Sequence, residues 1–306
     1  MIEVRKPGLF TTIQDLGRTG YRKYGIPWSG VMDKYSALMA NSLVKNKPDA
    51  SIIEITHSGP ELWFEDRASI ALVGAEAEAK LNGHSISMNA CHNVSSESLL
   101  SIGALSEGCR LYLAVNGGIE ARSHFGSSST YISAKLGGIH GDKLKKGDLL
   151  KIDSNFWTDK YCTLPEHLIK HFNSRSIRFT TGPEWDKLKV KQKEAFEKMK
   201  FKVSPESNRM GIRLQGELTN KINSQIISST VFPGTVQLPP GGFPIISMND
   251  GQTTGGYWRI ASVISIDLDY LAQQSPGNTV TFKKVEMDEA IELMRYQEKL
   301  LLEQLR

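Results

Sequence analysis

Pro244-Ile-Ile-Ser-Met248 and Asp250-Gly-Gln-Thr-Thr-Gly-Gly-Tyr257 are the most informative stretches of this 306-residue chain. The apolar first stretch is typical of a short strand. The second holds three glycines, two threonines, one carboxylate and one amide. Glycines let a ligand approach the main chain closely, and the small polar side chains supply donors and acceptors. The pattern predicts a strand that runs into a ligand-facing loop, with a tight turn between two strands as the alternative.

Three further regions have the same character, because Gly or Pro residues frame a few polar side chains in each of them. These regions are 11–18 together with 25–33, 126–130 together with the glycines at 137, 138 and 141, and 232–242. Four such clusters predict one composite pocket that is assembled from distant parts of the chain.

The composition excludes several classes of protein. The net charge is only +4, from 37 basic and 33 acidic residues, and no basic run is interleaved with aromatic residues, which argues against nucleic acid as a partner. No apolar run approaches the roughly 18 residues that span a bilayer, and the N-terminus lacks an apolar signal core. Cys91, Cys109 and Cys162 have no metal-like spacing and leave an odd thiol. We expect a cytoplasmic protein with reduced cysteines.

Short runs with strand character dominate the chain. Residues 69–73, 110–115, 176–180 and 279–282 end in turn-forming residues and favour strands by alternation and β-branched content. Asn82-Gly83 predicts a type I′ hairpin turn. Many short strands with few helices predict a mainly β protein of barrel or sandwich architecture.

Three helices are expected. Asp33 can cap the first. Residues 185–199 are expected to form the second, with Glu194 and Lys198 paired. The third starts near Asp288. The polar region 155–175 is the best candidate junction, so we expect one barrel over residues 1–174 and a second over 175–306, which carries the terminal helix.

Three acidic residues are candidate general bases. Asp15 lies three residues before Arg18. Arg18 could clamp a carboxylate or carbonyl of a ligand, while Asp15 orients Arg18 or takes a proton. A local salt bridge between the two residues is the alternative. Glu54 interrupts the apolar run Ile52-Ile-Glu-Ile55, where a buried carboxylate must be paired or have a raised pKa; a solvent-facing position is the alternative. Asp250 opens the glycine-rich stretch.

The candidate ligand-binding residues lie mainly in the second half of the chain. Arg209 and Arg213 flank Met210-Gly-Ile212, and residues four apart in a strand point the same way, which suits an anion; a surface charge pair is the alternative. The predicted substrate-binding residues are Arg18, Asp33, Arg209, Arg213, Gln237, Thr253, Thr254 and Gly255.

Several common sites are not predicted. The seven histidines are scattered without metal spacing, so we expect no metal. Ser127, Ser128 and Ser129 do not lie in a G-x-S-x-G elbow. No phosphate-binding loop followed by Lys occurs, so the chain alone is not expected to hydrolyse ATP.

At these loops the sequence resembles the biotin-dependent carboxyltransferase family, which includes the C component of 5-oxoprolinase, the carboxyltransferase part of urea carboxylase, and the regulator KipA. The matching motifs run nearly end to end. They are Thr12-Ile-Gln-Asp-Leu-Gly-Arg18, Ser29-Gly-Val-Met-Asp33, Tyr112-Leu-Ala-Val-Asn-Gly-Gly118, Arg209-Met-Gly-Ile-Arg-Leu214, Pro233-Gly-Thr-Val-Gln-Leu-Pro-Pro240 and Asp250-Gly-Gln-Thr-Thr-Gly-Gly-Tyr257. The chain departs from the usual pattern at Ser128 and Asp142, where Arg is usual, at Asn208 in place of Asp, and at Trp258 in place of Pro.

The resemblance implies two cyclophilin-like barrels and a partner similar to KipI or to the B component of 5-oxoprolinase. The A component of 5-oxoprolinase, or a biotin carboxylase and carrier, would be further partners. It implies an enzyme component that acts on a small amide: ATP-dependent opening of 5-oxoproline to glutamate, or carboxylation of urea or a related amide from carboxybiotin. In either chemistry Thr253, Thr254 and the glycine N–H groups would cradle the amide oxygen, much as an oxyanion hole does. No cofactor is expected on this chain alone, since ATP would act through the complex. A KipA-type regulator that binds and antagonises a KipI-like inhibitor is the non-enzymatic alternative.

Overall fold

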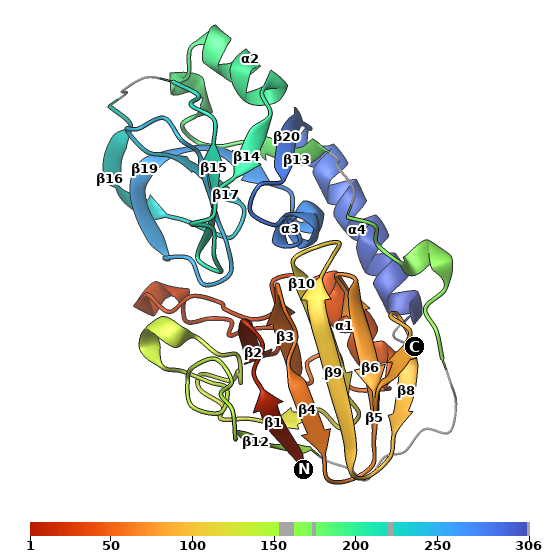
Figure 1. Ribbon diagram of the computed structural model, residues 1–306. Helices are drawn as coiled ribbons and strands as arrows, with labels where there is room; N and C mark the ends of the chain where they lie inside the picture. Colours follow the sequence, from red (N-terminus) through yellow and green to blue (C-terminus); the bar gives the residue numbers. More distant parts are fainter. Residues whose placement is uncertain (153–161, 173–175, 220–222, 305–306) are drawn as a thin grey trace. The chain divides into compact units, whose positions relative to one another are not determined.

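The computed structural model describes residues 1–152, 162–172, 176–219 and 223–304 (Figure 1). The chain divides into two compact units. Unit 1 comprises Met1–Thr19, Ser29–Phe172 and Leu301–Arg306, and unit 2 comprises Gly20–Trp28 and Asn173–Leu300. The expected boundary between residues 174 and 175 lies outside the described residues, so this division into two domains stays a prediction.

Unit 1 is built from two antiparallel sheets. The first has seven strands in the order β11 (Ile119–Glu120), β12 (Leu149–Ile152), β1 (Ile2–Lys6), β4 (Glu61–Phe64), β9 (Ser98–Leu105), β6 (Ala77–Leu81) and β7 (His84–Ile86). The second has five strands in the order β2 (Phe10–Gln14), β3 (Ile52–Thr56), β10 (Arg110–Val115), β5 (Ala68–Gly74) and β8 (Cys91–Val94).

One apolar core joins the two sheets of unit 1. Strand β1 contributes Ile2 and Val4 from the first sheet, and strand β3 contributes Ile53 and Ile55 from the second. These side chains are fully buried. Alternation along β3 then sends Glu54 to the opposite face of the same sheet, where helix α1 (Lys34–Leu43) packs against β5 and β10.

Helix α1 begins where the sequence predicts it. The Asp33 side chain accepts a hydrogen bond from the backbone N–H of Ser36 at 3.0 Å, which satisfies one of the free amides at the helix start. Tyr35, Met39 and Leu43 pack in a second apolar cluster, which also holds Tyr112 of β10. The cap and this cluster therefore fix the position of Asp33.

Unit 2 is a closed barrel. The strand order is β13 (Ser176–Thr181), β20 (Thr279–Lys284), β14 (Phe201–Val203), β15 (Gly211–Gln215), β18 (Ile245–Ser247), β17 (Thr235–Leu238) and β19 (Thr254–Val263), with β16 (Gln225–Thr230) added to β19. Pairing of β13 with β19 closes the ring of seven strands. The expectation of a mainly β protein with barrel architecture is confirmed.

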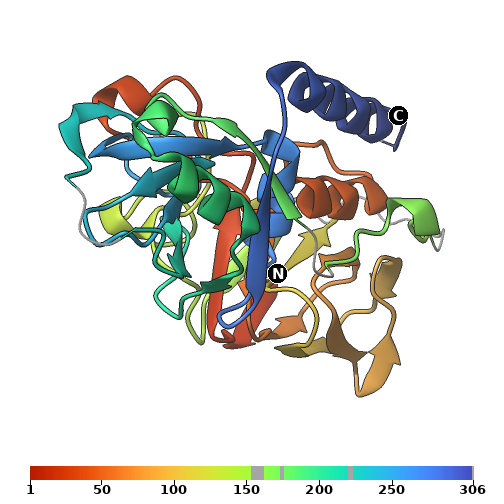
Figure 2. The ribbon, with the colours of Figure 1, turned by 90° about the horizontal axis from the view of Figure 1, so that it is seen from above.

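A cluster of aromatic side chains packs together in unit 2. Phe196 of helix α2 (Val190–Lys198) stacks on Phe282 of β20 with ring centroids 4.5 Å apart, and Phe179 and Phe201 contact it edge-on or tilted. Helix α3 is Ser265–Ala272 and helix α4 is Met287–Gln304. Figure 2 shows α4 following directly after β20.

Most expected elements are present. The Asn82-Gly83 hairpin joins β6 and β7, and both turn residues have positive φ, as a type I′ turn requires. The expected single helix over 185–199 is wrong. Residues Trp185–Lys187 form a 3₁₀ turn, and Lys189 has an extended backbone before α2 begins. Glu194 and Lys198 do pair, at 3.2 Å. Within the described residues, no helix has the length and apolar character needed to cross a membrane.

Candidate functional site

Asp15 follows strand β2 and binds residues 126–130 of unit 1, which we call the serine-rich loop. Its Oδ1 accepts hydrogen bonds from Gly17 N–H at 2.8 Å, Ser127 Oγ at 2.6 Å and Ser129 Oγ at 2.5 Å. Its Oδ2 accepts from the Ser128 N–H at 2.6 Å and the Ser128 hydroxyl at 3.0 Å. Burial alone would raise the pKa of Asp15, but these hydrogen bonds outweigh it and lower the pKa. Asp15 therefore fixes the loop of residues 127–129, and both its orienting role toward Arg18 and its role as a base stay predictions.

Arg18 is almost fully buried beside the same loop. It donates to the carbonyl oxygen of His124 at 3.4 Å and to that of Ser129. Its guanidinium therefore ties the loop backbone to the segment after β2. Asp15 and Arg18 lie in one loop assembly, as their spacing predicts, and contact of Arg18 with a substrate stays a prediction.

Glu54 lies at the centre of a buried network in unit 1. Its Oε2 accepts hydrogen bonds from Met32 N–H and from the Tyr112 hydroxyl, both at 2.8 Å. The Tyr112 oxygen in turn accepts from the Asp33 N–H at 2.7 Å. Glu54 is thus buried, as one of the two sequence readings requires, and it is well supplied with partners.

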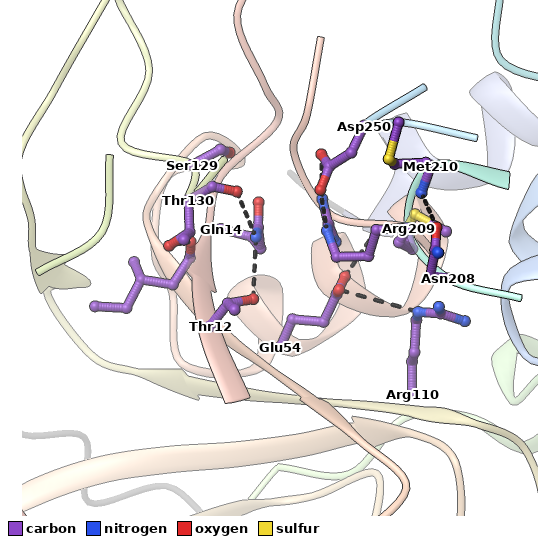
Figure 3. A network of polar contacts seen from close by, with 12 residues as sticks. Thr12, Gln14, Glu54, Arg110, Ser129, Thr130, Asn208, Arg209, Met210 and Asp250 are labelled. Carbon is purple, nitrogen blue, oxygen red and sulfur yellow. Dashed lines mark hydrogen bonds and ion pairs between the residues drawn. The ribbon is translucent and has the colours of Figure 1, made fainter. Parts of the chain in front are cut away.

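Arg110 completes this network. Its Nε lies 4.0 Å from Glu54 Oε1, and both side chains are almost fully buried (Figure 3). Burial raises the pKa of the Tyr112 hydroxyl well above its usual value, and the negative charge of Glu54 adds to the effect. Tyr112 therefore stays protonated and donates to Glu54.

The amide of Gln14 bridges two further residues of unit 1. Its Nε2 donates to Thr12 Oγ1 at 3.0 Å and to the Thr130 carbonyl at 3.2 Å (Figure 3). Strand β2 and the serine-rich loop are thereby joined a second time. Gln14, Tyr112 and Arg110 were not singled out from the sequence, because their partners are distant along the chain.

Arg209 and Asp250 form a buried ion pair in unit 2. Arg209 Nε lies 2.8 Å from Asp250 Oδ2, and Nη2 lies 3.1 Å from Oδ1 (Figure 3). The Asp250 N–H also donates to the Arg209 carbonyl at 2.9 Å. Two-point contact of this kind fixes the relative position of the loops before β15 and after β18.

The expectation that Arg209 and Arg213 share one strand face is wrong. Strand β15 begins only at Gly211, so alternation does not extend to Arg209. The Arg213 side chain is 52% exposed and lies 3.8 Å from Glu206. It lines a separate pocket of about 310 Å³ with Pro239, Phe243 and neighbouring residues of unit 2.

Gly255 lies between two glutamine side chains. A methyl group on Gly255 would lie 2.5 Å from Gln237 Oε1, 3.1 Å from Gln252 Nε2 and 2.9 Å from Val231 Cγ2. Gln237 is 5% exposed, and its Nε2 donates to Ser247 Oγ at 3.0 Å. Among the described residues, Gln237 Oε1 has no hydrogen-bond partner. A buried acceptor without a partner is costly, so this atom calls for a ligand or a water.

The two threonines of the glycine-rich stretch have different surroundings. Thr253 is 8% exposed, and its carbonyl accepts from the Val231 N–H at 3.0 Å. Thr254 is exposed at the start of β19. The predicted loop is therefore shorter than expected, since residues 254–257 already belong to a strand. Gln252, whose amide faces Gly255, is one of the donors and acceptors expected in this stretch, but it was not assigned to substrate binding.

The four departures from the family pattern have local contacts. Ser128 binds Asp15, as described above. Asp142 Oδ2 pairs with Lys145 at 2.9 Å, and Asn208 Oδ1 accepts from the Met210 N–H at 2.8 Å. Lys187 lies over the Trp258 ring at 5.6 Å. Ser128, Asp142 and Asn208 therefore stabilise loops in this chain, whereas Trp258 lies in strand β19.

The described residues contain no cluster of three or more His, Cys, Asp or Glu side chains suited to a metal ion. The composite pocket that the sequence predicts would draw on both units, and it stays a prediction. Each unit by itself holds a set of fixed polar groups. Unit 1 has the fully hydrogen-bonded carboxylate of Asp15 and the buried Glu54–Tyr112 network. Unit 2 has the Arg209–Asp250 ion pair and the Gln237 Oε1 acceptor, which lacks a partner among the described residues.

Known proteins are similar to this chain in sequence and in fold. A family model described as "Carboxyltransferase domain, subdomain A and B" matches residues 24–284. The C component of 5-oxoprolinase from Escherichia coli (strain K12) is 35% identical over 301 residues, which covers 98% of this chain and 96% of that protein. The urea amidolyase of Saccharomyces cerevisiae is 35% identical over 301 residues, but the match covers 92% of this chain and only 16% of that protein.

A solved structure has the same fold as this chain. The crystal structure of the K. lactis urea amidolyase matches 98% of this chain and 20% of its own, with a TM-score of 0.92 and 31% sequence identity. The mainly β fold and its polar loops define a barrel protein with preformed polar sites. The chain belongs to the carboxyltransferase-domain family, subdomains A and B. Its relatives are components of enzyme complexes or segments of multidomain enzymes.

Proposed function

We propose that this protein is the C component of an ATP-dependent 5-oxoprolinase-type complex, which opens the cyclic amide of 5-oxo-L-proline to L-glutamate. The observation that carries the proposal is the open acceptor at Gln237 beside the Gln252 amide. An amide substrate presents one N–H donor and one carbonyl acceptor side by side. Gln237 Oε1 and Gln252 Nε2 supply the complementary acceptor and donor around Gly255.

The chemistry follows from this pairing. Gln237 would accept the lactam N–H, which discriminates against analogues that lack it, because the buried oxygen would again be unpaired. Gln252 would donate to the amide oxygen and stabilise the charge that develops there when water attacks the carbonyl carbon. The base stays a prediction among Asp15, Glu54 and Asp250. ATP would be bound by a partner, since this sequence has no phosphate-binding loop followed by Lys.

Sequence similarity supports the 5-oxoprolinase proposal. The C component of 5-oxoprolinase from Escherichia coli is 35% identical over 98% of this chain. A partner similar to KipI or to the B component of 5-oxoprolinase is therefore part of the proposal, and the A component of such a complex would be the third protein.

Carboxylation of urea or a related amide is the second candidate. The identity to urea amidolyase is also 35%, and the same donor and acceptor suit urea or the ureido ring of carboxybiotin. Bound carboxybiotin would supply the carboxyl group, and Gln237 and Gln252 would orient the amide that receives it.

A substrate panel separates these candidates. The chain is co-purified with the proteins encoded beside it and assayed with ATP on 5-oxoproline and on urea, the latter with a biotin carboxylase and carrier. Glutamate formation from 5-oxoproline supports the proposal. Turnover of urea alone would replace it with the second candidate. Binding of a KipI-like inhibitor without any turnover would favour a KipA-type regulator.

A further inference from the structure

Cys91 and Cys162 lie opposite each other in a short antiparallel contact of unit 1. Ala90 pairs with Thr163 in an isolated β-bridge, the Cys91 N–H donates to the Cys162 carbonyl at 2.8 Å, and the Leu164 N–H donates to the Asn89 carbonyl at 2.9 Å. The register therefore places residue 91 against residue 162. Opposed residues of an antiparallel pair point to the same face.

The separation suits a disulfide. Opposed residues have Cα atoms about 4.5–5.5 Å apart, and disulfides join Cα atoms about 4.4–6.8 Å apart. Both side chains pack on the same apolar cluster, Cys91 buried and Cys162 half-buried. Burial raises the pKa of the Cys91 thiol to about 11, and the neighbouring Cys162 contributes to the rise.

We propose that Cys91 and Cys162 form an intramolecular disulfide when the protein meets a small oxidised disulfide such as glutathione disulfide. The half-buried Cys162 thiolate attacks first, forms a mixed disulfide and releases one glutathione thiolate. The Cys91 thiolate then attacks the Cys162 sulfur and releases the second. Both protein thiols are oxidised, and glutathione disulfide is reduced to two thiols that take up the two protons.

Formation of the mixed disulfide at Cys162 makes the Cys91 thiol easier to deprotonate. Once Cys162 is in a mixed disulfide it carries no thiolate charge, so one of the two causes that raise the Cys91 pKa is removed. Burial remains, and we therefore expect ring closure to be slower than the first exchange.

The disulfide would restrain residues that pack against the Glu54 network. It would join strand β8 to the segment after Cys162, where the Leu168 carbonyl accepts from the Tyr35 hydroxyl at 2.9 Å. Tyr35 of helix α1 and Tyr112, the partner of Glu54, pack in the cluster that contains Cys91. The two cysteines thus belong to the same apolar cluster as Tyr112, which hydrogen-bonds to Asp33 and Glu54.

Thiol counting on the full chain tests the proposal. The protein is incubated with glutathione disulfide, and free thiols are counted in denaturant before and after. The count should fall from three to one, and a non-reducing peptide map should show the peptide of Cys91 linked to that of Cys162. The oxidised chain should also melt at a higher temperature, because the bridge closes a long loop.

Two variants provide the controls. Cys109→Ser should still form the bridge, because Cys109 takes no part in it. Cys91→Ser should stop at a glutathione adduct on Cys162. Three unchanged thiols in the wild type, a persistent glutathione adduct on the wild type, or a disulfide-linked dimer would each overturn the proposal.

Discussion

Arg209 donates two hydrogen bonds to Asp250, from Nε to Oδ2 at 2.8 Å and from Nη2 to Oδ1 at 3.1 Å. Both side chains are more than nine-tenths buried. The pair connects the loop before β15 to the glycine-rich loop after β18. It therefore holds the start of the stretch that leads to Gln252 and Gly255.

Replacing Arg209 by Ala should destabilise unit 2 strongly. The change leaves the buried Asp250 carboxylate without its charged partner, which typically costs about 3–5 kcal/mol. Arg213→Ala is the matched control, because this exposed side chain lies 3.8 Å from Glu206 and should change stability by no more than about 0.5 kcal/mol. Urea denaturation of both variants measures the difference. Equal losses would contradict the assignment of the ion pair.

Asp15→Asn should weaken unit 1 in a pH-dependent way. The folded pKa of Asp15 is lowered, so its ionised form stabilises the fold above the unfolded pKa of about 3.9. That stabilisation is lost as the pH falls through the folded value. We expect a loss of about 1.5–3 kcal/mol near pH 7, the range for hydrogen bonds to a charged group.

Unfolding free energies of wild type and Asp15→Asn between pH 7 and pH 3 check this. The gap between the two proteins should be constant at neutral pH and should narrow in acid. A gap that widens as the pH falls would show that Asp15 is not held ionised by the serine loop.

Tyr112→Phe should cost about 1–3 kcal/mol of stability. The change removes the donor to Glu54 Oε2 and the acceptor of the Asp33 N–H, and both groups are buried. Tyr296→Phe serves as the control, because that ring is 64% exposed. Thermal unfolding of the two variants gives the comparison, and a Tyr112→Phe protein as stable as the wild type would argue against the network.

Gly255→Ala should abolish amide binding, because the new methyl group would lie 2.5 Å from Gln237 Oε1 and 3.1 Å from Gln252 Nε2. Gly241→Ala is the control within the same unit, since its methyl group would meet only Phe243 Cδ2 at 3.6 Å. Calorimetric titration of the assembled complex with 5-oxoproline measures both. Retained affinity in Gly255→Ala would place the amide elsewhere.

The fold was predictable wherever the signal is local. Asn82-Gly83 specifies its hairpin because only a few residues tolerate positive φ, and Asp33 specifies a helix start because its side chain replaces a missing backbone acceptor. The 3₁₀ turn at Trp185 was not predicted, since Lys189 adopts an extended backbone in a run with strong helix formers. Tertiary packing of Trp185 on Phe179 decides the outcome there.

The candidate site was predictable only in part, because its partners are distant in sequence. The Asp15 carboxylate was a clear candidate, but its donors lie at residues 127–129. Glu54 stood out as a charge in an apolar run, while its partner Tyr112 looked like an ordinary strand residue. Arg209 and Arg213 were grouped by strand periodicity, which fails because the strand starts between them.

Reconstitution of the complex tests the central claim most directly. The candidate partner proteins are assayed for ATP-dependent conversion of 5-oxoproline to glutamate with the wild-type chain, without it, and with Gln237→Leu in its place. The account predicts turnover with the wild-type chain, none without it, and a loss of about 10²–10³-fold in kcat/KM with Gln237→Leu, since a substrate N–H is left unpaired. Full turnover without the chain, or with Gln237→Leu at wild-type kcat/KM, would contradict the account.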